Sequence, residues 1–359
     1  MKEDQKIRVG ISIGDLNGIG SEVVLKTFED SRMMDFCTPI LFASAKIITF
    51  LKKHYHINTP LHSIDSLEKI TDGKINVYNL WKESVDINFG KEDEKIGEYA
   101  IKSFKAAVEA LNNDQIDVLV TAPINKKSIQ SDTFNFPGHT DYLNQEIEGD
   151  SLMFMITDTL KVGLLTDHVA IKDISGHITP ELIKRKVATI DKALQQDFGV
   201  RKPKIAILGV NPHSGDNGVI GNEDEDILKP TVQEINNSGT LVYGPYAADS
   251  FFGSDTYKNF DAIVASYHDQ GLIPFKTLSF GKGVNYTAGL SKIRTSPDHG
   301  TAFEIAGKNK ADHGSFKEAV FTAIAIYRNR KEFESLTKDP LKRQPRKSRF
   351  QKKKPNPSN

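Results

Sequence analysis

The sequence predicts an α/β fold, built on a mixed, mostly parallel β-sheet that is sandwiched by helices. Apolar runs of strand length alternate along the chain with segments of helical period, which is the pattern of strands joined by crossover helices. The run "MFMITDTLKVGLL", residues 153–165, is expected to form a hairpin, so part of the sheet should be antiparallel. The expected strands are residues 7–14, 38–44, 75–80, 116–123, 151–158, 161–168, 204–211, 241–246 and 261–268.

Amphipathic helices are expected between these runs. The clearest is Glu98–Leu111, whose apolar residues recur three or four positions apart and therefore share one face. Pro180–Phe198 is a second, because Thr179 can cap a helix that has proline at its first position. Ser21 is expected to cap a further helix, "EVVLKTFED". Such helices cover the faces of a mostly parallel sheet.

Length and composition are those of an ordinary globular chain. Its 359 residues suit one large or two ordinary domains, and 38% hydrophobic with 26% charged residues is normal usage. No apolar run approaches the roughly 20 residues that a membrane-spanning helix needs, so we expect a soluble, cytoplasmic protein. Cys37 is the one cysteine, which excludes an internal disulfide and a cysteine-rich metal site. Any metal would therefore need His, Asp or Glu ligands.

Charge is unevenly distributed along the chain. Leu341–Asn359 holds eight Lys or Arg residues and no acid, which leaves the preceding residues with 39 cations against 47 acids. We expect residues 341–359 to be a basic, disordered tail outside the folded unit of residues 1–340. The alternative for the tail is a contact with nucleic acid or another acidic surface.

Several expected strands end in polar residues, and three of these ends carry a histidine: His168, His213 and His268. In an open α/β sheet, ligands bind beyond the carboxyl ends of the strands, where loops converge. Neutral imidazoles from separate strands can build a metal site with open positions for a substrate. The alternative for each histidine is a hydrogen-bonded core or loop residue, and both interpretations stay open. Other such ends carry Asp15, Asn17, Gly18, Asn125, Lys126, Asn211 and Asp269.

The segment Pro274–Lys308 holds further candidates. Lys276 and Arg294 are cations near the expected site, and Asn285 offers both a donor and an acceptor, which suits a phosphorylated, carboxylated metabolite. The alternative is solvated loop charge. The run "SPDHGTAFEIAG" is expected to start a helix whose free N–H groups could receive a nucleotide phosphate. Neither G-x-G-x-x-G nor G-x-x-x-x-G-K-[ST] occurs, so a nicotinamide cofactor would need a non-Rossmann site.

A series of motifs, in order, carries a resemblance to a known family. They are "GDLNGIGSE", "TAPINK", "FPGHTDYL", "GVNPHSGDNG", "YHDQGLIPFK", "GVNYTAGL" and "RTSPDHGTAFEIAGK". Together they resemble the 4-hydroxythreonine-4-phosphate dehydrogenase family of bacterial pyridoxal phosphate synthesis, from about Val9 to Tyr327. The chain is also similar to the wider isocitrate and isopropylmalate dehydrogenase fold. The resemblance implies that residues 1–340 are a catalytic unit of two α/β subdomains, with the active site in the cleft.

The resemblance also implies roles for particular residues. A divalent metal would be held by His168, His213 and His268, with ligands drawn from both subunits of a homodimer. The candidates for proton transfer or ligand orientation are Lys276, Asp269 and Asp249. The implied substrate contacts are His139, Thr140, Lys276, Asn285 and Arg294. The implied cofactor contacts are Ser296, Asp298, His299, Gly300, Thr301 and Ala302.

The implied activity is the NAD-dependent, divalent-metal-dependent oxidation and decarboxylation of 4-phosphooxy-L-threonine to 3-amino-2-oxopropyl phosphate. NADP in place of NAD, and zinc, cobalt, nickel or magnesium as the metal, stay open. The close alternative is a paralogous dehydrogenase of 4-phospho-threonate or erythronate. An alternative of another class is a nucleic-acid-binding protein that acts through the basic tail, and the intact histidines argue against it. Neither nucleic acid nor a membrane is an expected partner.

Departures from the family pattern are few. Leu16, Asn17 and Ser21 stand in the run where the family usually shows "GDPAGIGPE". Asp167 and Ala170 stand where threonine and proline are more frequent. These changes leave the histidines in place and bear on the fine geometry of the substrate site.

Overall fold

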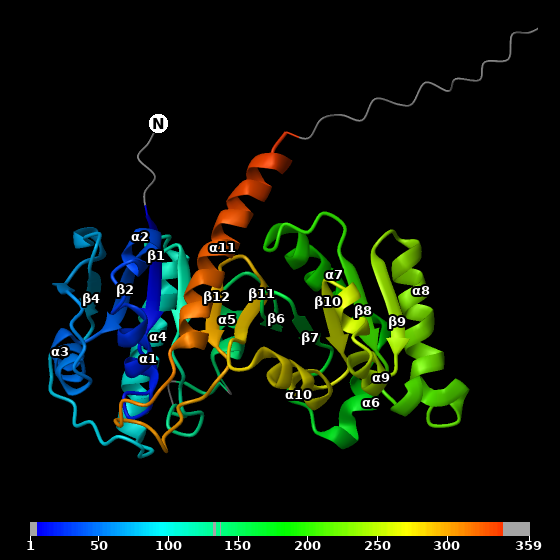
Figure 1. Ribbon diagram of the computed structural model, residues 1–359, viewed down its shortest axis with the longest axis horizontal. Helices are drawn as coiled ribbons and strands as arrows, with labels where there is room; N and C mark the ends of the chain where they lie inside the picture. Colours follow the sequence, from blue (N-terminus) through cyan, green and yellow to red (C-terminus); the bar gives the residue numbers. More distant parts are fainter. Residues whose placement is uncertain (1–5, 132–133, 137, 340–359) are drawn as a thin grey trace, which may run out of the picture.

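The computed structural model describes residues 6–131, 134–136 and 138–339, whose strands form one sheet (Figure 1). The sheet has 12 strands in the order β3-β4-β2-β1-β5-β12-β11-β6-β7-β10-β8-β9, so the predicted α/β class with a mixed, mostly parallel sheet is confirmed. The strands are β1 Ile7–Ser12, β2 Cys37–Ala43, β3 Leu61–Ile64, β4 Ile75–Asn79, β5 Val118–Thr121, β6 Gly149–Ile156, β7 Lys161–Leu164, β8 Lys204–Leu208, β9 Leu241–Tyr246, β10 Ala262–Ala265, β11 Val284–Leu290 and β12 Arg294–Pro297.

Parallel strands make up both ends of the sheet, and antiparallel strands make up its centre. All neighbours from β3 to β12 in the sheet order are parallel, and so are β7, β10, β8 and β9. Between these two groups, β11 pairs antiparallel with β12 and β6, and β6 pairs antiparallel with β7. The β6–β7 pair is the hairpin predicted from the sequence.

Helices cover both faces of the sheet. They are α1 Gly20–Thr27, α2 Met33–Phe36, α3 Ala45–His54, α4 Glu94–Asn112, α5 His139–Glu146, α6 Ile174–His177, α7 Pro180–Gln196, α8 Lys229–Asn237, α9 Ala248–Gly253, α10 His268–Ser279 and α11 Gly314–Thr337. The long α11, orange in Figure 1, packs on β5, β11 and β12 and also contacts α1 and α7, so these three helices share one face, called here the back face. Among the described residues, no helix is both long and apolar enough to cross a membrane.

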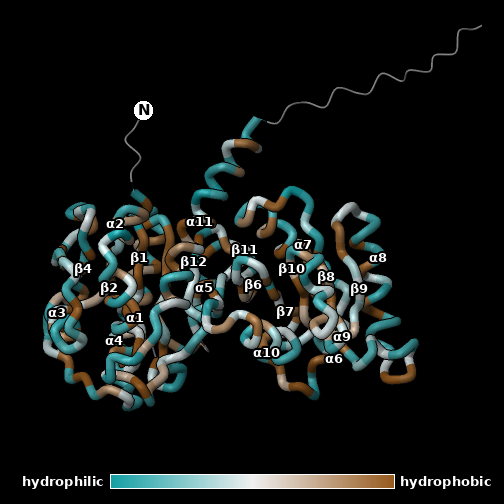
Figure 2. The backbone as a smooth tube through the Cα atoms, in the orientation of Figure 1, coloured by the Kyte–Doolittle hydropathy of each residue, from teal (hydrophilic) through white to brown (hydrophobic). Residues whose placement is uncertain are grey.

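The apolar core differs between the two faces. On the back face, one continuous cluster extends across both halves of the sheet, from Val9 on β1 to Ile207 on β8. The front face has two separate clusters, one around Phe104 under α4 and one around Phe275 under α10. Figure 2 shows apolar segments along the strands, such as β1 and β10, and hydrophilic segments over much of the outside. Between its two clusters, the front face is left open at the central strands.

One predicted helix cap is confirmed and the other is wrong. The Thr179 hydroxyl accepts a hydrogen bond from the Leu182 N–H, directly ahead of α7, as expected. Ser21 does not cap α1, because the helix begins at Gly20 with Ile19 as its N-cap. The Ser21 hydroxyl is instead buried without a partner. A side chain inside the first turn cannot take the place of the residue that precedes the helix.

Three segments of the carboxyl-terminal half differ from expectation. β11 and β12 were not predicted as strands, and α10, which begins at His268, was not predicted as a helix. The helix expected in "SPDHGTAFEIAG" is a series of turns, such as the one closed by the Ile305 N–H and the Ala302 carbonyl at 3.1 Å. Ala302 has a φ of 43°, which is left-handed backbone and stops a right-handed helix from forming. The predicted tail, residues 341–359, lies outside the described residues. The division into two subdomains stays a prediction.

A buried polar cluster fixes β11 from behind. Asp197 is fully buried and accepts hydrogen bonds from Arg330 Nε at 2.7 Å and from the Tyr286 hydroxyl at 2.6 Å. Arg330 Nη2 also donates to the Tyr286 hydroxyl oxygen, at 2.9 Å. Tyr286 stands on β11 between Asn285 and Thr287, which point to the opposite face. The cluster therefore ties α7 and α11 to the strand that carries front-face polar residues.

Breaking this cluster should cost much more stability than breaking a surface ion pair. We expect Arg330→Met to lower the free energy of unfolding by about 3–5 kcal/mol, because it leaves the Asp197 carboxylate buried without its cation. The control is Arg32→Met, which removes an exposed pair with Asp30 and should leave the stability almost unchanged. Urea unfolding measures both variants, and equal losses would contradict the role of the cluster.

Candidate active site

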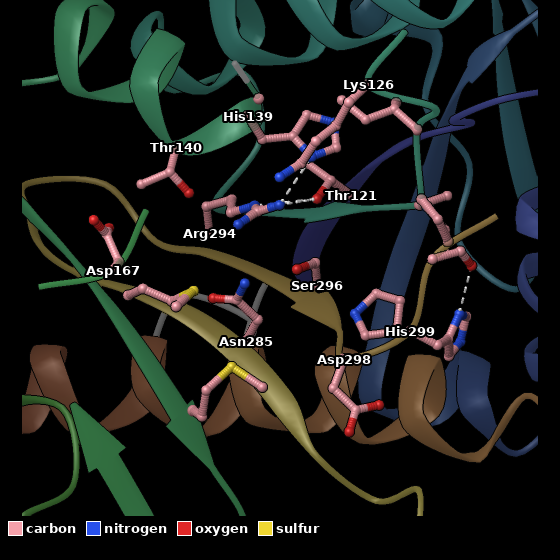
Figure 3. Close-up of a pocket in the computed structure, with 18 of the residues that line it drawn as sticks. Thr121, Lys126, His139, Thr140, Asp167, Asn285, Arg294, Ser296, Asp298 and His299 are labelled. Atoms are coloured by element: carbon pink, nitrogen blue, oxygen red, sulfur yellow. Dashed lines mark hydrogen bonds between the residues drawn. The ribbon is translucent and has the colours of Figure 1, made fainter. Parts of the chain in front are cut away.

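A cavity of about 290 Å³ opens on the front face, over the central strands and between the two apolar clusters (Figure 3). β6, β11 and β12 form its floor, the loop after β5 and the start of α5 form one wall, and the loop after β7 with α10 forms the other. The predicted site residues that line it are His139, Thr140, His168, Lys276, Asn285, Arg294, Ser296, Asp298, His299 and Gly300. The predicted site residues that do not line it are His213, Asp249, His268, Asp269, Thr301 and Ala302.

The floor of the cavity follows from strand alternation. Met155, Asn285 and Ser296 are direct cross-strand neighbours on β6, β11 and β12. Successive side chains of a strand point to opposite faces, so the adjacent Tyr286 and Thr295 point to the back face, where both are buried. Each central strand therefore supplies apolar core on one side and cavity lining on the other.

Arg294 carries a buried positive charge at the floor, with 3% of its surface exposed. It donates to the Thr121 hydroxyl from Nε at 3.1 Å and from Nη2 at 2.6 Å, and to the Thr287 hydroxyl from Nη1 at 3.2 Å. Burial lowers the pKa of Arg294 to about 9. The partners that the described residues offer it are all neutral. A buried guanidinium in neutral surroundings favours an anionic group of a ligand.

His139, at the start of α5, completes this arrangement. Its Nδ1 accepts a hydrogen bond from Arg294 Nη2 at 3.1 Å, and since arginine only donates, the proton of the neutral ring belongs on Nε2. Burial, and then the neighbouring Arg294 charge, holds the pKa of His139 well below its usual value. Among residues 6–131, 134–136 and 138–339, His139 Nε2, Asn285 Oδ1 and His299 Nε2 are buried without partners. Polar atoms left in this state at a cavity are candidates for contact with a ligand.

His168 and His268 form a second chemical group at the edge of the cavity, with ring centroids 6.2 Å apart. His268 Nδ1 is hydrogen-bonded to Asp269 Oδ1 at 2.7 Å, which leaves Nε2 free, as in a metal-binding histidine that a carboxylate orients. The two histidines follow the adjacent parallel strands β7 and β10, and His213 follows β8, the next strand. All three histidines therefore come after the carboxyl ends of neighbouring strands.

The histidines do not form a complete metal site within one chain. In the described ranges, no group of three His, Cys, Asp or Glu side chains is placed to hold an ion. His213 lies in the segment Pro212–Gly218, where its φ is 53° and the following residues also have positive φ. His213 is therefore not grouped with the His168–His268 pair in the described part of the chain. The three-histidine site stays a prediction.

The predicted cofactor residues lie at the end of β12 and on the turns that follow. Asp298 Oδ1 accepts a hydrogen bond from the Ser315 hydroxyl at 3.1 Å, so the start of α11 holds this end of the segment. The Thr301 carbonyl accepts from the Ile19 N–H at 3.0 Å, which ties the segment to the start of α1. A cofactor here would contact turns rather than the helix start that we expected.

The three candidates for proton transfer are placed differently. Lys276 lines the cavity from α10. Asp269 contacts His268, so its position suits orientation of that ring. Asp249 lies in the first turn of α9 and does not line the cavity. Of the three, Lys276 alone has a side chain at the cavity.

Sequence reasoning left out several residues of the cavity. Thr121 accepts two of the Arg294 hydrogen bonds, and Met153 and Met155 form an apolar part of the lining. Lys126 also lines it, and the sequence had named this residue among the polar residues at strand ends. Thr121 carried no signal for a site residue, because a threonine at the end of an apolar run is an ordinary strand residue.

Comparison with known proteins identifies the family. Residues 35–323 match the family model described as "Pyridoxal phosphate biosynthetic protein PdxA". The chain belongs to this family. A 4-hydroxythreonine-4-phosphate dehydrogenase of Bacteroides thetaiotaomicron is 43% identical over 344 residues, which are 95% of this chain and 94% of that protein. A protein of Oceanobacillus iheyensis, provisionally named D-threonate 4-phosphate dehydrogenase, is 34% identical over 89% of this chain and 97% of its own length.

Solved structures agree with this assignment. The crystal structure of a 4-hydroxythreonine-4-phosphate dehydrogenase from Klebsiella pneumoniae matches with a TM-score of 0.78 and 29% identity. The match covers 91% of this chain and 99% of that chain. The family expected from the ordered motifs is therefore confirmed.

In this member of the PdxA family, a buried acid, Asp15, lies behind the wall formed by the loop after β5. Its N–H donates to the Pro123 carbonyl at 2.9 Å, and its Oδ1 accepts from the Asn17 N–H at 2.9 Å. Its Oδ2 is buried without a partner. Burial raises the pKa of Asp15 to about 6, although the bond from Asn17 acts in the opposite direction. The stability of the folded chain should therefore depend on the ionisation of Asp15.

We expect the stability advantage of Asp15→Asn over the wild type to grow as the pH rises. The pKa of Asp15 is 3.8 in the unfolded chain and about 6 in the folded one. At pH values between these two, the folded wild type keeps a proton on Asp15 that the unfolded chain has lost. Wild-type stability therefore falls through this window, and the variant lacks that loss. The difference between them should grow by roughly 1 kcal/mol from about pH 5 to about pH 7.5. Urea unfolding measures it, and a constant difference would show that Asp15 titrates normally.

Proposed function

We propose that the chain is a cytoplasmic enzyme of pyridoxal phosphate synthesis, which oxidises and decarboxylates 4-phosphooxy-L-threonine with NAD to 3-amino-2-oxopropyl phosphate. The observation that carries the proposal is the buried Arg294 guanidinium, whose hydrogen-bond partners are neutral hydroxyl and imidazole groups. Its charge favours an anionic group of the substrate. Two curated relatives are named 4-hydroxythreonine-4-phosphate dehydrogenase, at 43% and 40% identity. A cavity of about 290 Å³ suits a small metabolite.

The chain's own residues supply the recognition of the anion. Thr121 and Thr287 hold the plane of the Arg294 guanidinium, and His139 Nε2–H offers a further donor beside it. Lys126 and Lys276 add positive charge at the two walls. Phosphate and carboxylate groups are bound well by such sets of charged donors.

The reaction itself needs a hydride acceptor and a way to handle protons. A bound nicotinamide would supply the acceptor for the hydride of C3, and the 2-amino-3-oxo acid formed from the substrate is a β-keto acid, which loses carbon dioxide and takes up a proton at C2. We assign to Lys276 the transfer of the proton of the C3 hydroxyl, because this side chain lies at the cavity. Ser296, Asp298, His299 and Gly300 would contact the cofactor.

His168 and His268 would hold a divalent metal, with His213 as the third ligand. When bound, such a metal lowers the pKa of a substrate hydroxyl and withdraws electrons from a carbonyl group, which favours oxidation and then decarboxylation. Asp269 orients His268 through Nδ1 and leaves Nε2 available, which supports this assignment.

A homodimer is part of the proposal. Ile273 on α10 is 63% exposed, and Phe280, directly after this helix, is 84% exposed. Val219, which follows the segment that carries His213, is 80% exposed. Large exposed apolar side chains are candidates for burial against a partner. A second copy of the chain bound at these places would explain how a metal-binding side chain of one subunit could join the His168–His268 pair of the other.

A second candidate substrate is 4-phospho-threonate, which the relative from Oceanobacillus iheyensis favours. The two compounds share the phosphate, the carboxylate and the C3 hydroxyl, and they differ at C2, where one has an ammonium group and the other a hydroxyl. Two carboxylates, Asp141 and Asp167, line the cavity. They would stabilise an ammonium group, so the amino acid is the preferred substrate in this proposal.

The test is NADH formation with each of the two compounds, before and after treatment with a chelator. We expect turnover of 4-phosphooxy-L-threonine that is lost on chelation and restored by zinc, cobalt, nickel or magnesium. Turnover of the threonate alone would move the chain to the second candidate. Absence of turnover with both compounds, in metal-loaded protein, would refute the proposed function.

Replacing Arg294 should affect binding of the phosphorylated substrate. We expect Arg294→Met to raise KM by about 10- to 100-fold, because it removes charge-assisted hydrogen bonds from the anion site. The control is Arg32→Met, whose exposed guanidinium pairs with Asp30 and lies outside the cavity lining. Steady-state kinetics measure both, and an unchanged KM in the Arg294 variant would remove this residue from the site.

A further inference from the structure

We infer that Glu22, Lys26 and Tyr55 form a buried anchor, which holds the segment Thr301–Ala311 in place before any ligand binds. This segment continues directly from Asp298–Gly300 at the cavity, to which the proposed function assigns the cofactor. The inference rests on that proposed function. It adds a positioning role for residues that do not line the cavity.

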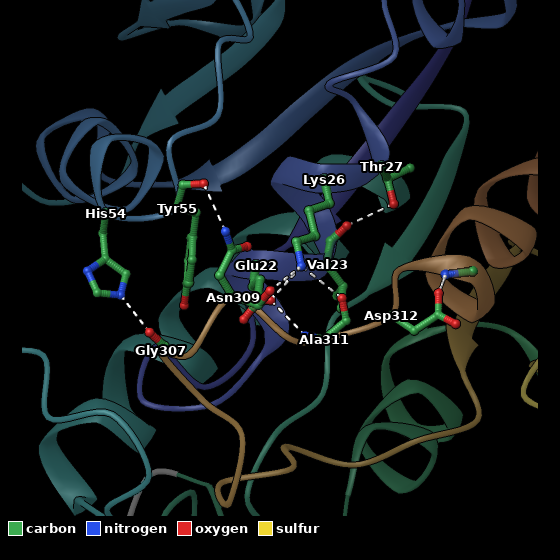
Figure 4. A network of polar contacts seen from close by, with 11 residues as sticks. Glu22, Val23, Lys26, Thr27, His54, Tyr55, Gly307, Asn309, Ala311 and Asp312 are labelled. Carbon is green, nitrogen blue, oxygen red and sulfur yellow. Dashed lines mark hydrogen bonds and ion pairs between the residues drawn. The ribbon is translucent and has the colours of Figure 1, made fainter.

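The first half of the anchor is an ion pair on α1. Lys26 Nζ donates to Glu22 Oε1 at 2.8 Å, to the Ala311 carbonyl at 3.0 Å and to the Asn309 carbonyl at 3.2 Å (Figure 4). Glu22 Oε1 also accepts from the Ala311 N–H at 2.8 Å. The Glu22 side chain is 0% exposed and that of Lys26 is 19% exposed. Both polar backbone groups of Ala311 are therefore bonded to one buried pair.

The second half comes from the end of α3. His54 Nε2 is hydrogen-bonded to the Gly307 carbonyl at 2.9 Å, and Asn309 Nδ2 donates to the Tyr55 carbonyl at 3.3 Å. The His54 ring stacks on Phe89 with centroids 4.8 Å apart. Gly307 has a φ of +74°, and a Cβ there would lie 2.5 Å from the Phe89 ring, so glycine is required.

The Tyr55 side chain lies where the two halves of the anchor meet. Within the part of the chain that the structure describes, Ser21 Oγ, Glu22 Oε2 and the Tyr55 hydroxyl are buried polar atoms without a hydrogen-bond partner. Burial, and then the Glu22 charge, raises the pKa of Tyr55, so its hydroxyl stays protonated and can donate. In Figure 4 this hydroxyl lies between Gly307 and Glu22.

These contacts join the cofactor segment to the amino-terminal half of the chain. Next to the cavity, the Thr301 carbonyl accepts from the Ile19 N–H at 3.0 Å, and a Cβ on Gly18 would lie 2.9 Å from the same carbonyl oxygen. The turns of the segment are thus fixed at both ends by α1 and near the middle by α3. A backbone ordered in advance loses little entropy when a cofactor binds, which favours affinity.

The test compares NAD binding to the full chain by isothermal titration calorimetry in wild type and variants. We expect Lys26→Met to weaken NAD binding at least about tenfold and to speed amide hydrogen exchange in residues 301–311, because the segment loses its preformed conformation. Binding of inorganic phosphate at Arg294 should not change. Lys26→Arg should retain most of the affinity, since a cation remains.

The matched control is Lys69→Met. Lys69 pairs with Asp65 at the same spacing of four residues and the same 2.8 Å, but the side chains are 63% and 76% exposed. This variant should leave NAD binding unchanged. If Lys26→Met does not fold, the double variant Glu22→Gln/Lys26→Met removes both charges and takes its place.

The possible failures can be told apart. NAD affinity that stays at the wild-type value while exchange in residues 301–311 rises would overturn the anchor. Equal weakening of NAD and phosphate binding would also overturn it, because the effect would then be general unfolding. Absence of NAD binding in the wild type would refute the cofactor assignment of the proposed function instead.

Discussion

The central strands β6, β11 and β12 must supply core residues to the back face and cavity residues to the front face, and the rest of the site depends on this constraint. Their back-face side chains, such as Phe154 and Tyr286, are fully buried in the continuous core. Because side chains alternate along a strand, floor residues such as Met155 and Asn285 lie between two residues that are packed behind them. Asn285 and Arg294 therefore keep their positions through the packing of the opposite face.

That rigidity lets the protein keep a positive charge in an unfavourable place. Burial of Arg294 opposes its charged form, and the threonine hydroxyls around it compensate only in part. His139 adds no opposing charge, because its own pKa is lowered by the same burial. An anionic group of a substrate would therefore compensate the buried charge of Arg294, which favours its binding. Fixed donors of this kind need little rearrangement on binding.

The sequence predicted the strand ends that carry His168 and His268, and it named Asn285, Arg294 and Ser296 as site residues, but it missed that the last three lie on strands β11 and β12. Apolar runs before His168 and His268 mark buried parallel strands, and the position after such a run is a strand end in any α/β sheet. β11 has alternating Val284, Tyr286 and Ala288, but the polar Asn285 and Thr287 between them, of which Asn285 lines the cavity, resemble a solvated loop. The segment at Ala302 was misjudged because contacts with α1, distant in sequence, decide its backbone. Local propensity does not contain that information.

The site is divided between two halves of the sheet. Arg294, with Thr121, lies on β12 and β5, and the segment Thr301–Ala311 is held by α1 and α3. The histidine pair and Lys276 belong instead to β7, β10 and α10. Their separation is set by β11 and β6, the strands that the Asp197 cluster holds from behind. A substrate with an anionic group for Arg294 and a hydroxyl for the histidine pair would span both halves. Its anionic end can then contribute binding energy to the alignment of the reacting carbon, which is how groups remote from the reaction accelerate it.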